Sequence, residues 1–280
     1  MMSEDKKERT VNYELLRILC MIMVVGCHFF GKEPEGALRG ISFGTIEYFI
    51  YYWIDAMVYV CVNCFVLITA FHKIRNVNFY KVSKFWLQIE FYSILGIGIA
   101  IIVGSSYSKT DLLKCLIPLT GGSYWFCTAY ILLMILSPVL NVYLDKSTMV
   151  QKEKLIVVLT IIFSIWNMIS YVGRTNTAFG GNVLWFIYLY LIGDYLKNNE
   201  PLYKKWHYIL LFLGITIFQS FSRILLGCLA KYVTGSVKGA GLFYGNDTLF
   251  CLLASIMLFQ LFRVADFSYI GDKLKKLSYM

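Results

Sequence analysis

VNYELLRILCMIMVVGCHFF, residues 11–30, is the first long apolar segment of the chain, and it contains an arginine, Arg17, and a histidine, His28. About 20 predominantly apolar residues are enough for a helix to cross the bilayer core of roughly 30 Å, so we expect this segment to span a membrane. An ionisable side chain inside such a helix costs roughly 2.5–3.5 kcal/mol on insertion scales. Arg17 and His28 are therefore expected to face a polar interior and to serve a function.

The composition of the whole chain is that of a membrane protein. Of its 280 residues, 58% are hydrophobic and 15% are charged, whereas an ordinary soluble domain is roughly 45–50% apolar. Apolar segments follow one another at residues 12–30, 46–71, 85–104, 124–144, 154–172, 183–197, 206–230 and 247–264. The sequence therefore predicts an all-α, polytopic transmembrane helical bundle of about eight spans, with one integral membrane domain over residues 1–280.

The positive charges are distributed unevenly between the two sets of connecting segments. Eighteen lysines and arginines lie on the side that includes the N-terminus and seven lie in the other connections, which with Arg223 inside a span makes the 26 of the chain. Cytoplasmic segments are enriched in these residues, so we expect a multi-pass protein of the cell membrane with a cytoplasmic N-terminus. The net charge of +9 follows this topology. Because no soluble face carries a basic stripe, we expect membrane lipids and no nucleic acid as partners.

The eight cysteines indicate neither a disulfide framework nor a metal site. Most of them fall inside the apolar segments, where a cysteine behaves as a small hydrophobic residue. Cys61 and Cys64 form a CxxC pattern, but the pattern lies inside a span and has no second pair and no nearby histidine cluster. We therefore expect no bound metal.

His28 is a candidate for proton transfer because the unperturbed pKa of histidine, about 6.5, lies close to neutral pH. It lies near the predicted outer end of the first span, about 16 Å from Arg17. The second span places Glu47 near its outer mouth and Asp55 about two turns deeper, and we favour Asp55 as the partner because its burial is the costlier. Simpler roles remain open: Arg17 can pair with Glu14, and His28 can bond to a loop carbonyl.

A polar face marks the seventh span, where Thr216, Gln219, Ser220 and Arg223 recur at helical spacing. Hydrogen bonding between packed helices would explain such a face equally well. Arg223 would also suit an anionic group of a substrate or a counter-charge for Asp55. Trp125, near the outer end of the fourth span, fits either an interfacial anchor or a platform for a sugar ring.

Four segments of the chain resemble a known family. They are NYELLRILCMIMVVGCHFF (12–30), CVNCFVLITAFHK (61–73), YWFCTAYILLMILSPVLN (124–141) and GGNVLWFIYLYLIGDYL (180–196). In this order they are similar to the motif segments of the acyltransferase 3 family of polytopic membrane acyltransferases, which includes bacterial O-acetylases of exopolysaccharide and lipopolysaccharide. The resemblance extends over nearly the whole chain.

The resemblance implies transfer of an acetyl or short acyl group from cytoplasmic acetyl-CoA to a hydroxyl of a cell-envelope polysaccharide or lipid-linked sugar. By resemblance, His28 is the catalytic general base and Arg17 binds the donor. Asp55, which the residues themselves suggest as the partner of His28, can equally well pair with a tyrosine or an arginine for structural reasons. Arg223, Trp125 and Asn182 are expected to bind the acceptor. Two alternatives stay open, namely a non-enzymatic membrane transporter and an inactive, truncated paralogue.

The chain also departs from the family pattern in three places. The family's SGY reads Thr69-Ala70-Phe71, which we expect to alter packing more than chemistry. The family's RxxR pair is absent at the start of the third span, where Lys81 and Lys84 are its substitutes for holding a CoA phosphate. The family has about ten spans, so its last helices are expected to be missing after Met280.

Overall fold

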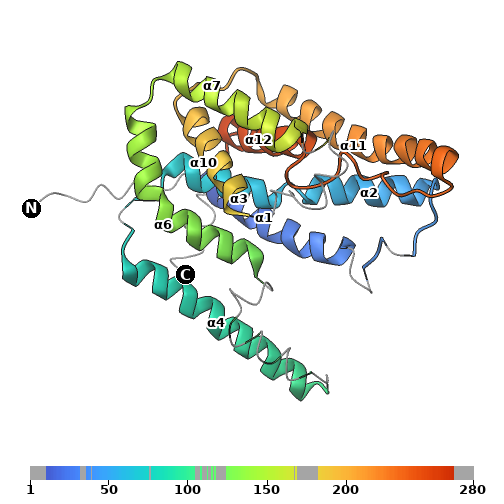
Figure 1. The fold of residues 1–280 in the computed structure, drawn as a ribbon, viewed down its shortest axis with the longest axis horizontal. Helices are drawn as coiled ribbons and strands as arrows, with labels where there is room; N and C mark the ends of the chain where they lie inside the picture. The colour runs from blue at the N-terminus through green and yellow to red at the C-terminus, as the bar shows by residue number, and fades with distance from the viewer. Residues whose placement is uncertain are drawn as a thin grey trace, which may run out of the picture.

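The computed structural model describes residues 11–31, 36–38, 40–75, 77–104, 124–166 and 182–267, with the single positions 108, 112, 115, 117 and 168. The long elements in these ranges are helices (Figure 1). They are α1 (Val11–Phe30), α2 (Ile46–Val58), α3 (Cys61–His72), α4 (Phe79–Ile102), α6 (Trp125–Lys146), α7 (Met149–Thr160), the π-helix η1 (Ile161–Trp166), α10 (Val183–Lys197), α11 (Lys205–Thr234) and α12 (Leu249–Val264). The prediction of an all-α helical membrane bundle is confirmed.

Within the part of the chain that the structure describes, five helical segments are long and apolar enough to cross a membrane. They are α1, the pair α2 and α3 taken together over Ile46–His72, α4, α6 and α11. Helix α12 is apolar but has only 16 residues. Helix α10 has 15 residues, and most of its side chains are buried against other helices. The short predicted span at 183–197 is thus an inner helix of the bundle.

Two helices begin earlier than hydropathy predicts, and each start has a capping side chain. Asn78 accepts a hydrogen bond from the backbone N–H of Lys81 at 2.9 Å, so α4 begins at Phe79 and contains both Lys81 and Lys84. At α7, Thr148 and Gln151 form a reciprocal capping box. The predicted end of that span at residue 172 lies outside the described residues.

The second predicted span is divided at Tyr59 and Val60. The Tyr59 N–H still donates to the carbonyl of Asp55 at 2.9 Å, and the Cys64 N–H donates to that of Val60 at 3.0 Å. Both residues keep right-handed helical dihedral angles, so the break interrupts the regular helix without ending the apolar span Ile46–His72, and neither proline nor glycine stands at it. The break lies one turn after Asp55.

Helices α3 and α10 form the centre of the bundle. Gly193 of α10 faces α3 so closely that a Cβ at this position would lie 3.0 Å from the carbonyl oxygen of Leu67 and would also press on the side chain of Ala70. Small residues of this kind let two membrane helices approach. Ala70, where the family has glycine, accordingly has a packing role.

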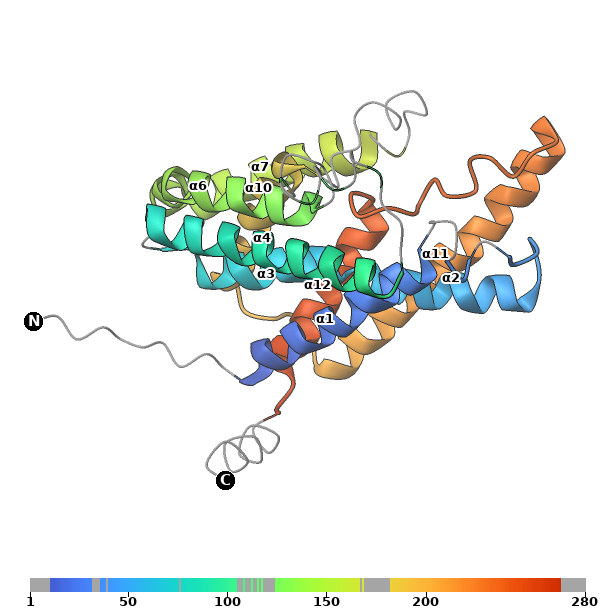
Figure 2. The same cartoon turned by 90° about the horizontal axis from the view of Figure 1, so that it is seen from below.

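The remaining helices surround this centre in two groups. Both views show α6 and α7, which contact α10, towards one end of the molecule and α2 with α11 towards the other, with α12 beside α3 between them (Figures 1 and 2). Helix α4 lies at the edge, beside α6 (Figure 1). Most of its apolar side chains are exposed, as expected for a surface that faces lipid.

Candidate active site

A pocket of about 180 Å³ lies between the end of α1, helix α2, helix α11 and the loop that precedes α12. Its lining residues are Gly31, Leu38, Tyr52, Asp55, Tyr59, Arg223, Tyr244 and Gly245. Tyr52, Asp55 and Tyr59 occur at positions i, i+3 and i+7, so consecutive turns present them on one side. The pocket thus brings together an acidic, a basic and several phenolic side chains from segments far apart in the sequence.

Arg223 is held in a fixed position by tyrosines. Its Nε donates to the Tyr48 hydroxyl at 3.0 Å and its Nη2 donates to the Tyr52 hydroxyl at 3.1 Å. The centre of its guanidinium lies 4.0 Å from the ring centroid of Tyr52 and 5.3 Å from that of Tyr244, which is the range of cation–π contacts. Arg223 occurs in none of the ion pairs between described residues.

The other members of the polar face of α11 make hydrogen bonds to α2 and to the loop that precedes α12. Thr216 accepts from the indole N–H of Trp53 at 3.1 Å, Gln219 donates to the carbonyl of Phe243 at 3.1 Å, and Ser220 donates to that of Phe49 at 2.7 Å. Arg223 likewise donates to two tyrosines of α2, so hydrogen bonding between packed helices is observed for Thr216, Ser220 and Arg223. Only Arg223 lines the pocket.

Asp55 is buried, with 6% of its surface exposed. Burial and the nearby Asp55 carboxylate both raise the pKa of the Tyr244 phenol, against the lowering effect of Arg223. The carboxylate and the guanidinium therefore both act on this one phenol. The Tyr244 hydroxyl itself donates to the backbone carbonyl of Tyr52, which anchors the loop that carries it to α2.

His28 lies in the last turn of α1, and its side chain is exposed. It does not line the pocket, but Gly31, three residues later, does. Helix α1 is close to α2 at this level, because a Cβ on Gly26 would lie 3.2 Å from the Val58 side chain. The structure thus places His28 near the pocket, but no hydrogen bond or ion pair between described residues joins it to Asp55. The catalytic roles of both residues stay predictions.

Arg17 adopts the simpler of its two predicted arrangements, an ion pair with Glu14 one turn earlier in α1. Lys81 and Lys84 are exposed near the start of α4. The structure does not bring these three basic residues into the pocket. Their proposed contact with the acyl donor is a prediction.

Trp125 and Asn182 also lie away from the residues that line the pocket. Trp125 is the first residue of α6, and its ring stands edge-to-face with that of Phe186, with centroids 6.4 Å apart. Asn182 caps α10, because its side-chain oxygen accepts from the N–H groups of Leu184 and Trp185 at 2.9 and 3.4 Å. Asn182 therefore has a structural role besides the acceptor contact predicted for it.

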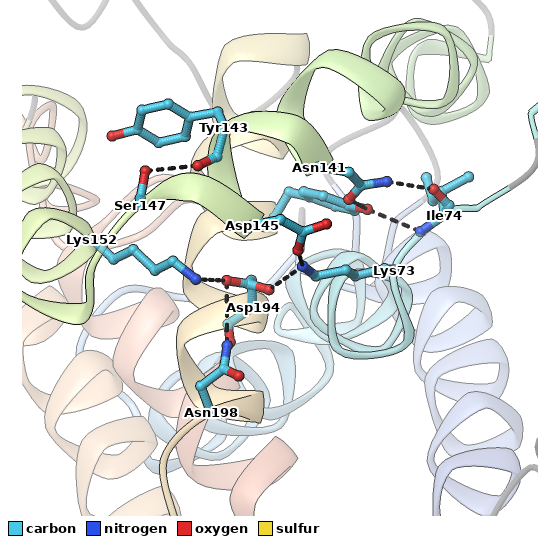
Figure 3. A network of polar contacts seen from close by, with 10 residues as sticks. Lys73, Ile74, Asn141, Tyr143, Asp145, Ser147, Lys152, Asp194 and Asn198 are labelled. Atoms are coloured by element: carbon cyan, nitrogen blue, oxygen red, sulfur yellow. Dashed lines mark hydrogen bonds and ion pairs between the residues drawn. The ribbon is translucent and has the colours of Figure 1, made fainter.

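An ionic cluster that the sequence does not reveal joins the ends of four helices (Figure 3). Lys73, which follows α3, lies 2.5 Å from Asp145 and 2.9 Å from Asp194, and Lys152 lies 2.6 Å from the second oxygen of Asp194. Burial tends to lower the pKa of Lys73, but the hydrogen bonds to Asp145 and Asp194 outweigh it and raise the pKa above its ordinary value. Lys73 also has a φ of 57°, a backbone conformation that non-glycine residues seldom adopt.

The residue after Lys73 is fixed by two more side chains. The Tyr190 hydroxyl accepts from the N–H of Ile74 and donates to the side-chain oxygen of Asn141, both at 2.9 Å. The Asn141 amide in turn donates to the Ile74 carbonyl at 2.8 Å. Asn141 is the asparagine of the SPVLN stretch, so this motif residue holds the end of α3.

No group of three or more histidine, cysteine or acidic side chains in the described part of the chain is placed to hold a metal ion. All eight cysteines are free. The groups that line the described pocket are a carboxylate, a guanidinium and phenols.

Comparison with known proteins gives one match. A family model of the acyltransferase 3 type, described as an acyltransferase domain, matches residues 11–280. A search of curated proteins and a search of solved structures found no match. The matched range contains the pocket, the ionic cluster and all five helices that are long enough to span a membrane. The chain therefore belongs to the acyltransferase 3 family of membrane acyltransferases.

Proposed function

We propose that this protein is an O-acetyltransferase that moves an acetyl or short acyl group from acetyl-CoA to a hydroxyl of a cell-envelope polysaccharide or lipid-linked sugar. The observation that carries the proposal is the pocket in which Asp55 and Arg223 meet at the end of α1 that bears His28. A sugar hydroxyl is a poor nucleophile until a base removes its proton. An acid–base pair beside a polar pocket in a member of this family supports that task.

In the proposed reaction, His28 takes the proton of the acceptor hydroxyl as the oxygen attacks the thioester carbonyl. The C–S bond of acetyl-CoA breaks, an ester C–O bond forms, and the CoA sulfur leaves with the proton from the imidazolium. Asp55 orients His28 and stabilises its positive charge, as a carboxylate does for a histidine base elsewhere. The attack requires all reacting groups to meet, so closure of α1 and α2 on the acceptor is part of the proposal.

On the donor side, Arg17, Lys81 and Lys84 are proposed to bind the phosphates of acetyl-CoA. Arginine and lysine are the usual partners of phosphate oxygens. The two lysines are exposed and lie on the side where the lysine and arginine count places the cytoplasm. The proposed topology therefore puts the donor and the N-terminus on one side of the membrane and the acceptor on the other.

The test measures ester-linked acetate released from purified envelope glycan. A strain from which the gene has been deleted carries the wild type, His28→Ala, Asp55→Asn or Arg17→Ala at matched membrane levels. We expect His28→Ala to lower the acetate at least about 100-fold, the scale of general-base catalysis. His207→Ala, at an exposed site near the start of α11, and Arg75→Ala, at an exposed site after α3, are the matched controls.

Acetate that does not differ between the wild type and the deletion strain would contradict the enzyme proposal. Unchanged acetate in His28→Ala would instead contradict the role of His28 and favour the transporter alternative. Membranes supplied with radiolabelled acetyl-CoA test the donor separately, because label must reach the glycan in the wild type and not in Arg17→Ala.

A further inference from the structure

The guanidinium of Arg223 has one edge occupied and one edge open. Nε and Nη2 donate to the hydroxyls of Tyr48 and Tyr52, so these two tyrosines take the edge that the two nitrogens share. Nη1 has no hydrogen-bond acceptor in the described part of the chain, and one N–H of Nη2 points the same way. This leaves a pair of parallel N–H groups, the arrangement that binds two oxygens of a carboxylate or phosphate at once.

The surroundings of Arg223 fix the direction of this open edge. The ring faces of Tyr52 and Tyr244 lie against the guanidinium. On the Nη1 side stands Gly241, where a Cβ would come within 2.8 Å of that nitrogen. A side chain at residue 241 would therefore displace the guanidinium, so the position of Arg223 depends on a glycine here.

The charge of Arg223 is not balanced by an ion pair among the described residues. Arg223 is nonetheless half-buried and lines the pocket, and a buried charge without a partner is costly. Asp55 and Arg223 line one pocket without forming an ion pair with each other.

We propose that Arg223 binds an anionic group on the acceptor, so that the substrate is an acidic sugar rather than a neutral one. This inference rests on the proposed function and names the class of its acceptor. The pocket of about 180 Å³ is smaller than the roughly 300–1,000 Å³ of a site for a drug-sized ligand, which suits one sugar ring. The carboxylate or phosphate lies against Arg223, and the hydroxyl to be acylated lies towards Asp55.

The experiment measures binding to the purified full-length protein in detergent, without an acyl donor. The probes are glucuronate, which carries a carboxylate, glucose 1-phosphate, which carries a phosphate, and neutral glucose. We expect one or both anionic probes to bind the wild type and glucose to bind far more weakly. Arg223→Gln should weaken the anionic probe about 10- to 100-fold, as expected for loss of hydrogen bonds to a charged group.

Lys231→Gln is the matched control, because it removes one positive charge from an exposed position of the same helix. Exposed charges contribute little to binding, so this variant should bind the anionic probe within about twofold of the wild type. Arg223→Lys keeps the charge but loses the planar pair of donors, and should weaken binding about tenfold. It also provides the test if Arg223→Gln does not fold. Stronger binding of glucuronate identifies a carboxylate, and stronger binding of glucose 1-phosphate identifies a phosphate.

Three results would overturn the proposal. Glucose could bind as well as the anionic probes, or neither anionic probe could bind the wild type. In the third case, both Arg223 variants would leave the binding unchanged. Because no donor is present, these results do not depend on acetyl transfer. Arg223-dependent binding in a protein that fails the glycan acetate test would reject the proposed function and keep the anion site.

Discussion

The ammonium of Lys152 lies 2.6 Å from a carboxylate oxygen of Asp194, and the Asp194 side chain has no exposed surface. Asp194 also pairs with Lys73, so one buried carboxylate balances two cations from different helices. Removing one partner of a buried pair costs about 3–5 kcal/mol, because it leaves the other charge unpaired. The cluster therefore makes the ends of α3, α7 and α10 interdependent.

We predict that Asp194→Asn destabilises the protein by about 3 kcal/mol or more, since it leaves both ammonium groups facing a neutral amide. Lys152→Met should destabilise less, because Lys73 still pairs with Asp194. Thermal unfolding in detergent measures both. Glu200→Gln, at a side chain with 96% exposure, is the control and should have almost no effect; an equal loss of stability in the control and in Asp194→Asn would contradict the role of the cluster.

The raised pKa of Lys73 predicts a loss of stability at alkaline pH. The folded state binds its proton more tightly than the unfolded state, whose lysine pKa is about 10.4. The stabilisation is therefore complete below that pH and disappears as the pH rises through the folded-state value. The melting temperature of the wild type should fall more steeply above about pH 10 than that of Lys73→Met, and parallel curves would refute the linkage.

The close packing around Gly193 predicts that a single added methyl group lowers the stability of the protein strongly. Gly193→Ala places a Cβ against the Leu67 carbonyl and the Ala70 side chain, and overpacking of this kind costs typically about 1–3 kcal/mol. Gly214→Ala is the matched control, since nothing lies within 4 Å of a Cβ there. It should be neutral or slightly stabilising in the helix. Similar melting temperatures for the two variants would show that α3 and α10 are not packed as described.

Tyr190→Phe tests the bonds that fix the end of α3. It deletes the hydroxyl that bonds to Ile74 and Asn141 and should cost about 1–3 kcal/mol, because two buried polar groups lose a partner. Tyr143→Phe is the comparison, as its side chain is exposed and should contribute little. Thermal unfolding of the two variants measures the difference. An equal loss of stability in Tyr190→Phe and Tyr143→Phe would contradict the role of the Tyr190 hydroxyl.

Activity should distinguish the two carboxylates considered as partners of His28. Asp55 is buried in the pocket, whereas Glu47 is exposed in the first turn of α2. Asp55→Asn should lower glycan acetylation about 100-fold, with a shift of the pH profile because the histidine loses its charged neighbour. Glu47→Gln should stay within about twofold, as an exposed charge interacts weakly. A larger loss of acetylation in Glu47→Gln than in Asp55→Asn would assign the partner role to Glu47.

The helices could be located from the sequence wherever long apolar segments are bounded by capping residues. The segment 183–197 was predicted at its observed limits, and Asn182 caps it. The start of α4 was missed because Lys81 and Lys84 make its first turns polar, although Asn78 is a capping residue. The break after Val58 was missed because hydropathy stays high through Tyr59 and Val60.

The site was predicted only in part, because its residues converge from separate elements. Asp55 and Arg223 stood out as charges inside apolar segments, and both line the pocket. The pocket tyrosines did not stand out in the sequence, since tyrosines are also common at membrane interfaces. They are Tyr52, Tyr59 and Tyr244. The spacing of Tyr52 and Tyr59 from Asp55 is a signal that would have found two of the three. The ionic cluster has no such signal, as Lys73, Lys152 and Asp194 are distant in sequence.

Helix α3, which begins after the break at Tyr59 and Val60, lies between the pocket and the ionic cluster. One end of this helix adjoins Tyr59 and the pocket, and the other adjoins Lys73 and the ionic cluster, about 18 Å away along the axis. Helix α3 is packed along its length against α10, so its two ends are held by the same neighbouring helix. The same helix thus contributes its first turn to the surroundings of the pocket and its last turn to the surroundings of the buried charges.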